Sequence, residues 1–181
     1  MKKIFIGYLL AAFTFSITLS NTQALGIPPP FVGVGLMAWG CREMKPHSRR
    51  FAWAAVFGAV LSVLLVGEWF AQLTGTLGAN GVGLSSLTSL LRLVFDLLWI
   101  WGIGDVEKKF STGMQGGALR VLWLLQFVTA GLTLLGLLAS ILIIFTAVGV
   151  MAATLLSVVF LVKLFKSWKA WDYLQRRGVV K

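Results

Sequence analysis

Three charged residues stand inside long apolar stretches of the sequence, and they are the best candidates for chemistry. Arg92 and Asp96 lie within "LLRLVFDLLWIW" (residues 90–101), and Glu68 lies within the apolar stretch before it. Arg92 and Asp96 are four residues apart, which places them on one face of a helix. Carboxylates inside a membrane segment are typical of proton or cation sites, where an arginine supplies the counter-charge.

The depth of these residues follows from the helices expected to carry them, over residues 51–73 and 87–104. Glu68 lies five residues before the end of the first helix, and Arg92 lies five residues after the start of the second. At 1.5 Å per residue, both are roughly 7–8 Å below the outer surface of the membrane. Because consecutive spans run antiparallel, we predict a single Glu68–Arg92–Asp96 cluster inside the helix bundle.

Two interpretations of this cluster stay open. A charge at the centre of a membrane helix costs about 2.5–3.5 kcal/mol, so the charges need partners inside the bundle. In the functional interpretation, Glu68 or Asp96 binds a proton or cation. In the structural interpretation, the ion pairs only fix the register of the helices. The second is favoured, because an arginine partner keeps carboxylates ionised and long side chains near the surface reach the interface.

The composition requires a membrane around the chain. Its 181 residues are 58% hydrophobic and only 12% charged, whereas soluble domains are about 45–50% apolar and about 25% charged. A transmembrane barrel is excluded because the apolar runs are long and unbroken instead of alternating. The sequence therefore predicts an all-α, polytopic transmembrane helical bundle.

The number of spans depends on the N-terminus. Residues 1–24 have the basic start, apolar middle and small residues of a signal peptide, or they form a first transmembrane helix; cleavage is slightly favoured. Residues 25–181 form a single transmembrane domain, with a short span near 31–41. The uncharged run 121–162 is long enough for two spans with a turn near 136–140. The bundle therefore has five spans after cleavage and six without it.

The basic residues orient the chain. Fifteen of the 16 fall on one side of the membrane if the spans alternate, and the opposite loops, 21–30 and 74–86, hold none. This asymmetry predicts a protein of the plasma (inner) membrane with a cytoplasmic C-terminus. The tail 163–181 interleaves basic and aromatic residues, which favours contact with anionic lipid over contact with a partner protein. Its candidate contact residues are Lys163, Lys166, Lys169, Arg176 and Arg177.

Three stretches resemble one another: "MAWGCREMK" (37–45), "WIWGIGDVEKK" (99–109) and "KSWKAWDYLQRR" (166–177). Each ends a predicted span with a tryptophan and then mixed charges. Three helical-hairpin repeats would produce this pattern, and transporters are often built from repeats. An interfacial tryptophan and a basic flank are also ordinary at the cytoplasmic end of any span. Both explanations stay open.

The sequence offers little catalytic chemistry. One cysteine, Cys41, and one histidine, His47, form neither a disulfide nor a metal site by themselves. We find no nucleophile–base pair and expect no enzyme activity, no cofactor, no metal and no nucleic-acid partner. The predicted function is that of a non-catalytic accessory or scaffold subunit of a membrane assembly, whose partners are the lipid bilayer and either other membrane subunits or a second copy. The alternative is a small transporter or channel that uses Glu68, Arg92 and Asp96.

Overall fold

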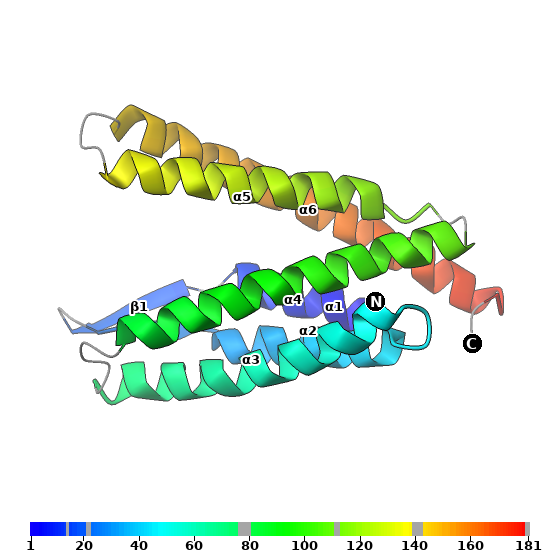
Figure 1. Cartoon of the computed structure of the whole chain (residues 1–181), viewed down its shortest axis with the longest axis horizontal. Coiled ribbons are helices and arrows are strands. Elements are labelled where there is room, and N and C mark those ends of the chain that lie inside the picture. The colour runs from blue at the N-terminus through cyan, green and yellow to red at the C-terminus, as the bar shows by residue number, and fades with distance from the viewer. Residues whose placement is uncertain (14, 21–22, 76–80, 111–112, 139–142, 180–181) are drawn as a thin grey trace. The chain divides into compact units, whose positions relative to one another are not determined.

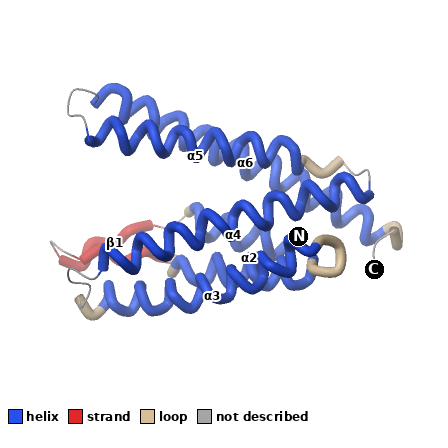
Figure 2. The backbone as a smooth tube through the Cα atoms, viewed as in Figure 1, coloured by secondary structure: helices blue, strands red, loops and turns tan. Residues whose placement is uncertain are grey.

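The computed structural model describes the chain apart from residues 14, 21–22, 76–80, 111–112, 139–142 and 180–181, and describes no side chains at 16–25, 81–83 and 130–146. Along the chain lie α1 (Lys2–Ala12), β1 (Phe15–Ser20), β2 (Gln23–Ile27), α2 (Pro30–Met44), α3 (Arg49–Leu73), α4 (Gly81–Phe110), α5 (Gly116–Leu138) and α6 (Ile143–Arg176) (Figure 1). The described part is all-helical except for one short hairpin (Figure 2). The chain divides into two compact units, Met1–Val106 and Glu107–Lys181.

Local sequence signals set the ends of α2 and α3. Proline is favoured in the first turn of a helix, and α2 begins at Pro30. Ser48 caps α3, because its side-chain oxygen accepts a hydrogen bond of 3.2 Å from the backbone amide of Arg50. After the end of α3, Gly75 adopts a φ of 69°, a left-handed conformation that suits glycine and stops helices.

α3 and α4 run antiparallel without a slip in register. Phe51 meets Gly102, Gly58 meets Phe95, and Glu68 meets Ser85. The first two contacts are seven residues apart on each helix, and the second and third are ten residues apart on each helix. Gly58 is required at its contact, because a Cβ there would lie 2.6 Å from the Phe95 ring.

The same register gives the depth of Arg92. Arg92 lies seven residues after Ser85, so it is level with the residue seven before Glu68, which is Leu61. Leu61 is the middle residue of α3 (Arg49–Leu73) and is fully buried. Arg92 is therefore level with the centre of a membrane-length helix.

α1 packs closely against α2 in the first unit. A Cβ on Gly7 would lie 2.5 Å from the backbone oxygen of Gly33, so the two helix backbones touch at this point. At the same face, Lys3 pairs with Glu43 near the end of α2. α1 also reaches α4, since the rings of Tyr8 and Trp99 are 5.9 Å apart in an edge-to-face arrangement.

Among the described residues, three helices are long and apolar enough to cross a membrane: α3, α4 (from Leu84) and α6 (from Ala147). α1 and α2, with 11 and 15 residues, rise only about 16 and 22 Å, which is short of a core of about 30 Å. α5 has 23 residues, and its described apolar part is Gly116–Thr129. Membrane-spanning helices are thus supported, whereas the predicted count of five or six is not confirmed.

The apolar stretch near the N-terminus is not one helix. α1 ends at Ala12, and β1 pairs antiparallel with β2, with Phe15 opposite Ile27. Aromatic and β-branched residues favour strands, and residues 15–18 carry three of them, Phe15, Ile17 and Thr18. An open hairpin leaves backbone amides unpaired at its edges, and the hydrocarbon core does not tolerate unpaired amides. The hairpin therefore cannot extend α1 across the membrane. Removal of residues 1–24 stays a prediction.

The second unit contains a pair of packed helices, α5 and α6. They divide the uncharged run 121–162 as predicted, since α5 ends at Leu138 and α6 begins at Ile143. The predicted turn at 136–140 lies partly in residues 139–142, outside the described chain. α6 continues as one helix of 34 residues to Arg176, about 51 Å long, so most of the basic tail is helical.

Candidate functional site

Glu68 is bound by two hydroxyl groups of α4. The Ser85 hydroxyl donates to Oε1 and the Thr88 hydroxyl donates to Oε2, each over 3.0 Å. Thr88 is buried, with 5% of its surface exposed. Each carboxylate oxygen therefore has its own donor, and the contact ties the end of α3 to the beginning of α4.

Arg92 and Asp96 form an ion pair within α4. The distance from Arg92 Nε to Asp96 Oδ2 is 3.4 Å, and the Asp96 side chain is 15% exposed. The other oxygen, Oδ1, accepts a hydrogen bond of 2.9 Å from the indole of Trp99. Arg92 and Trp99, both on the same helix as Asp96, thus supply the polar partners that a buried carboxylate requires.

The structure pairs two of the three residues of the predicted cluster. Arg92 and Asp96 pair as expected, but in the part of the chain that the structure describes Glu68 contacts Ser85 and Thr88 instead of Arg92. The reason is that α4 begins at Gly81, six residues before the predicted start at 87. Because of this earlier start, Ser85 is level with Glu68, and Arg92 lies about 10 Å deeper in the membrane than Glu68.

These groups lie along one face of α4. Successive members are three or four residues apart, which is the spacing of neighbours on a helix surface. We call this face the α4 polar stripe; it consists of Ser85, Thr88, Arg92, Asp96 and Trp99. Ser85 was missed because 74–86 was predicted to be a loop, and Thr88 was missed because the predicted register placed it above Glu68.

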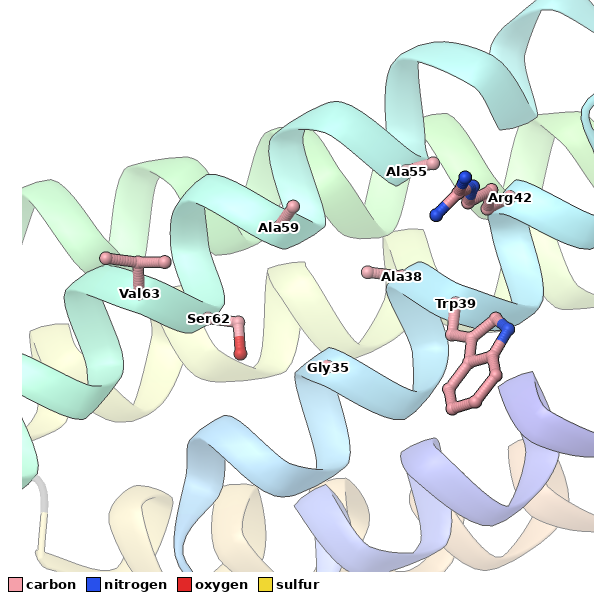
Figure 3. Close-up of a pocket in the computed structure, with 8 residues that line it drawn as sticks. All are labelled: Gly35, Ala38, Trp39, Arg42, Ala55, Ala59, Ser62 and Val63. Carbon is pink, nitrogen blue, oxygen red and sulfur yellow. The ribbon is translucent and has the colours of Figure 1, made fainter.

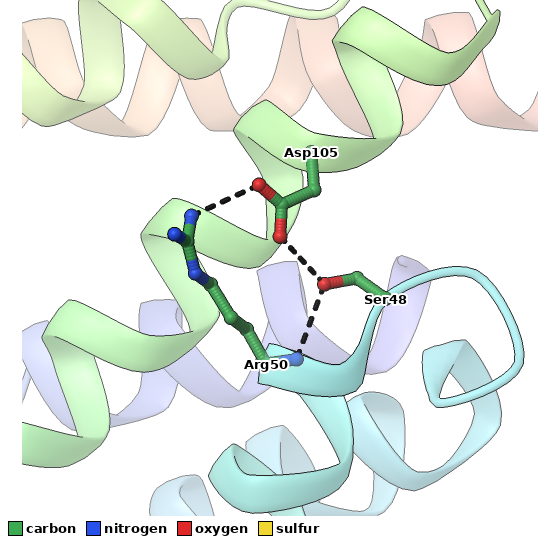
Figure 4. Close-up of polar contacts among 3 residues, drawn as sticks. All are labelled: Ser48, Arg50 and Asp105. Carbon is green, nitrogen blue, oxygen red and sulfur yellow. Dashed lines mark hydrogen bonds and ion pairs between the residues drawn. The ribbon is translucent and has the colours of Figure 1, made fainter.

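A second polar contact joins the opposite ends of α3 and α4. Asp105 Oδ1 lies 2.9 Å from Arg50 Nη1, and Asp105 Oδ2 accepts a hydrogen bond of 2.7 Å from the Ser48 hydroxyl (Figure 4). The same Ser48 oxygen caps α3. Polar contacts therefore hold this helix pair at both ends, with the Phe51 and Phe95 rings between them.

The chemistry available to this arrangement is limited. Both oxygens of Glu68 and both of Asp96 already have a partner, so a cation bound at either carboxylate would compete with those contacts. No three His, Cys, Asp or Glu residues lie close enough to hold a metal within the described ranges. The stripe can fix helix register, or it can exchange a proton or cation at Asp96 if Arg92 moves away.

The basic tail has two faces on α6. Phe160, Leu164, Ser167 and Trp171 are buried and follow helical spacing. The opposite face carries basic residues and a tyrosine at the same spacing: Lys166, Lys169, Tyr173, Arg176 and Arg177. An amphipathic helix with a basic face suits an anionic membrane surface.

The five predicted tail residues are not equivalent. Lys163 donates a hydrogen bond of 3.0 Å to the side chain of Gln115, so it joins α6 to the residue that precedes α5. Arg176 pairs with Asp172 at 2.9 Å. Lys169 lies 5.1 Å from the Trp168 ring centre, and Lys166 has an exposed side chain. Lys166 and Lys169 are therefore better placed than Lys163 to contact lipid.

Comparisons with protein-family models, with curated proteins and with solved structures find no match to this chain. The functional assignment therefore rests on the residues and the geometry described above. Those features define a class, an all-helical protein with membrane-length helices.

Proposed function

We propose that this chain is a multi-pass inner-membrane protein that acts as a non-catalytic accessory or scaffold subunit of a larger membrane assembly. The observation that carries the proposal is an apolar stripe on α6. Its members are spaced alternately by three and four residues, and each is about half exposed or more. They are Val148, Met151, Leu155, Val158 and Val162.

This spacing suits contact with another helix. Apolar residues that repeat every 3.5 residues form the seam along which two helices pack. The side of α6 that faces α5 is different, because Ser157 Oγ lies 3.1 Å from Gln126 Nε2 across the helix pair. This polar pair thus lies between α5 and α6, whereas the apolar seam lies on the other side of α6.

The orientation with cytoplasmic termini draws support from the charge distribution along the helices. Near the start of α3, Arg50 reaches Asp105 in α4, and Lys3 reaches Glu43 at the end of α2. α4 carries Lys108 and Lys109 in its last turn, and α6 carries Arg176 in its last turn. Basic residues at the ends of spans favour the cytoplasmic side.

Photo-cross-linking in native membranes tests the subunit proposal. A photoreactive residue at Met151 or Leu155 is expected to give one discrete adduct with another membrane protein. The matched control is Ser157, which faces α5 and is expected to cross-link only within the chain. Adducts with lipid alone at Met151 and Leu155 would overturn the proposal.

A second candidate function is that of a small transporter or channel. It is supported by the Arg92–Asp96 pair, because the pair is level with the middle of α3 and an ionisable group at that depth is costly to keep without a role. In this case Asp96 carries the proton or cation, and Glu68 lies nearer the outer surface. Liposome flux assays with Asp96→Asn and Glu68→Gln test it, and ion fluxes that neither variant changes would exclude it.

A further inference from the structure

A groove lies between α2 and α3 in the first unit, with a volume of about 540 Å³ (Figure 3). Sites for small molecules typically have about 300–1,000 Å³. Small side chains leave this space open where the two helices face each other. They are Gly35, Ala38, Ala55, Ala59 and Ser62.

The walls of the groove suit an apolar occupant. Ser62 is the one hydroxyl residue among those walls, and its hydroxyl already donates a hydrogen bond of 3.0 Å to the backbone oxygen of Phe31. Apart from Trp39 and Arg42 at one end, the other wall residues are alanines, a glycine and Val63. A polar ligand would lose its water here without finding new partners, which is unfavourable.

One end of the groove is cationic. Arg42 projects toward it beside Ala55, and Trp39 lies at the same end (Figure 3). Among the described residues, the Arg42 side chain has no carboxylate partner, because its neighbour Glu43 pairs with Lys3. Trp39 is 57% exposed and carries Lys3 3.9 Å from its ring centre, an arrangement typical of the membrane interface.

The groove has the length of one membrane leaflet. Along α3 it extends from Ala55, six residues into the helix, to Val63, just past the middle residue Leu61. This distance is about 12 Å at 1.5 Å per residue, and half of the bilayer core is about 15 Å. The groove therefore runs from the Arg42 end toward the midplane and stops there.

We propose that this groove binds an anionic phospholipid of the cytoplasmic leaflet, with an acyl chain along the alanine walls and the phosphate on Arg42. A long apolar groove with one cation at its interfacial end matches an acyl chain with one anionic end, and the cytoplasmic leaflet carries the anionic lipids. A transmembrane helix would need a seam through both leaflets. The site depends on the proposed orientation of the chain but not on the role as a subunit.

Lipid retention by the full-length protein tests the site. The protein is reconstituted in vesicles of phosphatidylglycerol and phosphatidylcholine, extracted in mild detergent, and its bound lipids are counted by native mass spectrometry. Arg42→Gln removes the cation, and Ala59→Leu fills the groove. Arg49→Gln and Val60→Leu are matched controls, because Arg49 is an exposed cation at the start of α3 and Val60 is exposed and does not line the groove.

We expect wild type to retain one phosphatidylglycerol selectively. Arg42→Gln should lower retention about fivefold, as the loss of one cation near anionic lipid implies. Ala59→Leu should lower it as well, because the leucine side chain occupies the space of the acyl chain. Arg42→Lys should restore most of it, and the two controls should not change it. Equal retention of both lipids, or equal losses in variants and controls, would overturn the site. A protein cross-linked to Ala59→Cys in native membranes would also overturn it, in favour of a helix as the occupant.

Discussion

Glu68 near the end of α3 accepts a hydrogen bond of 3.0 Å from the hydroxyl of Thr88, which lies one helical turn above Arg92 on α4. This contact fixes which residues of the two helices are level with each other. It separates Glu68 from the Arg92–Asp96 pair, and it explains how a carboxylate is kept in an apolar environment without a cation.

The first prediction concerns the Thr88 hydroxyl. Thr88→Val keeps the shape of the side chain but removes one of the two donors to Glu68, so the free energy of unfolding in detergent should fall by about 1 kcal/mol. Ser89→Ala is the control, because the Ser89 hydroxyl donates only to the backbone oxygen of Ser85 in its own helix. Equal losses in both variants would show that the contact with Glu68 contributes nothing.

The second prediction concerns the ion pair in the middle of the α4 polar stripe. Arg92→Leu leaves Asp96 without its counter-charge, so the free energy of unfolding should fall by about 3 kcal/mol. The double variant Arg92→Leu/Asp96→Leu removes both charges and should recover most of that loss. A double-variant cycle on the purified protein measures the difference. A double variant as unstable as the single one would contradict the pairing.

The helices of this chain could be predicted from the sequence, but their ends could not. Hydrophobic runs identified α3, α4, α5 and α6, because lipid demands apolar residues over whole spans. The start of α4 was missed, since glycines and serines between 81 and 86 indicate a loop when each is considered alone. That error of six residues placed Arg92 too near the surface. Ser85 and Thr88 were therefore not recognised as the hydrogen-bond partners of Glu68.

The third prediction is the topology. Single cysteines are introduced at His47, Thr74, Gly113 and Gly178 in a Cys41→Ala background. Thr74→Cys should react with a membrane-impermeant maleimide from outside the cell, and the other three should react only after permeabilisation, because the basic loops face the cytoplasm. Labelling of both His47→Cys and Gly178→Cys from outside would contradict the orientation.

The fourth prediction concerns retention of α1. A Cβ on Gly33 would lie 2.7 Å from the backbone oxygen of Gly7. If α1 stays in the mature protein, as this close packing favours, Gly33→Leu should force the helices apart and lower the melting temperature by several degrees. Gly67→Ala is the control, because nothing lies within 4 Å of a Cβ at that position. An unchanged melting temperature for Gly33→Leu would indicate that α1 is absent.

Side-chain contacts between distant parts of the chain were the least predictable feature. The sequence offered Lys163 as a free basic residue of the tail, yet its amino group is bound to Gln115, 48 positions earlier. The pairing of β1 with β2 was likewise unforeseen, because a short run of apolar residues suits a strand or a helix equally. Such contacts depend on which elements pack together, and the local pattern does not contain that information.

Co-purification from native membranes in mild detergent, with an intact mass for the recovered chain, tests the central claim most directly. We expect a stoichiometric membrane-protein partner, and the mass of the chain shows directly whether residues 1–24 are retained. Recovery of the chain alone, or only as a homo-oligomer, would contradict the role as an accessory subunit of a larger assembly and leave the transporter as the candidate.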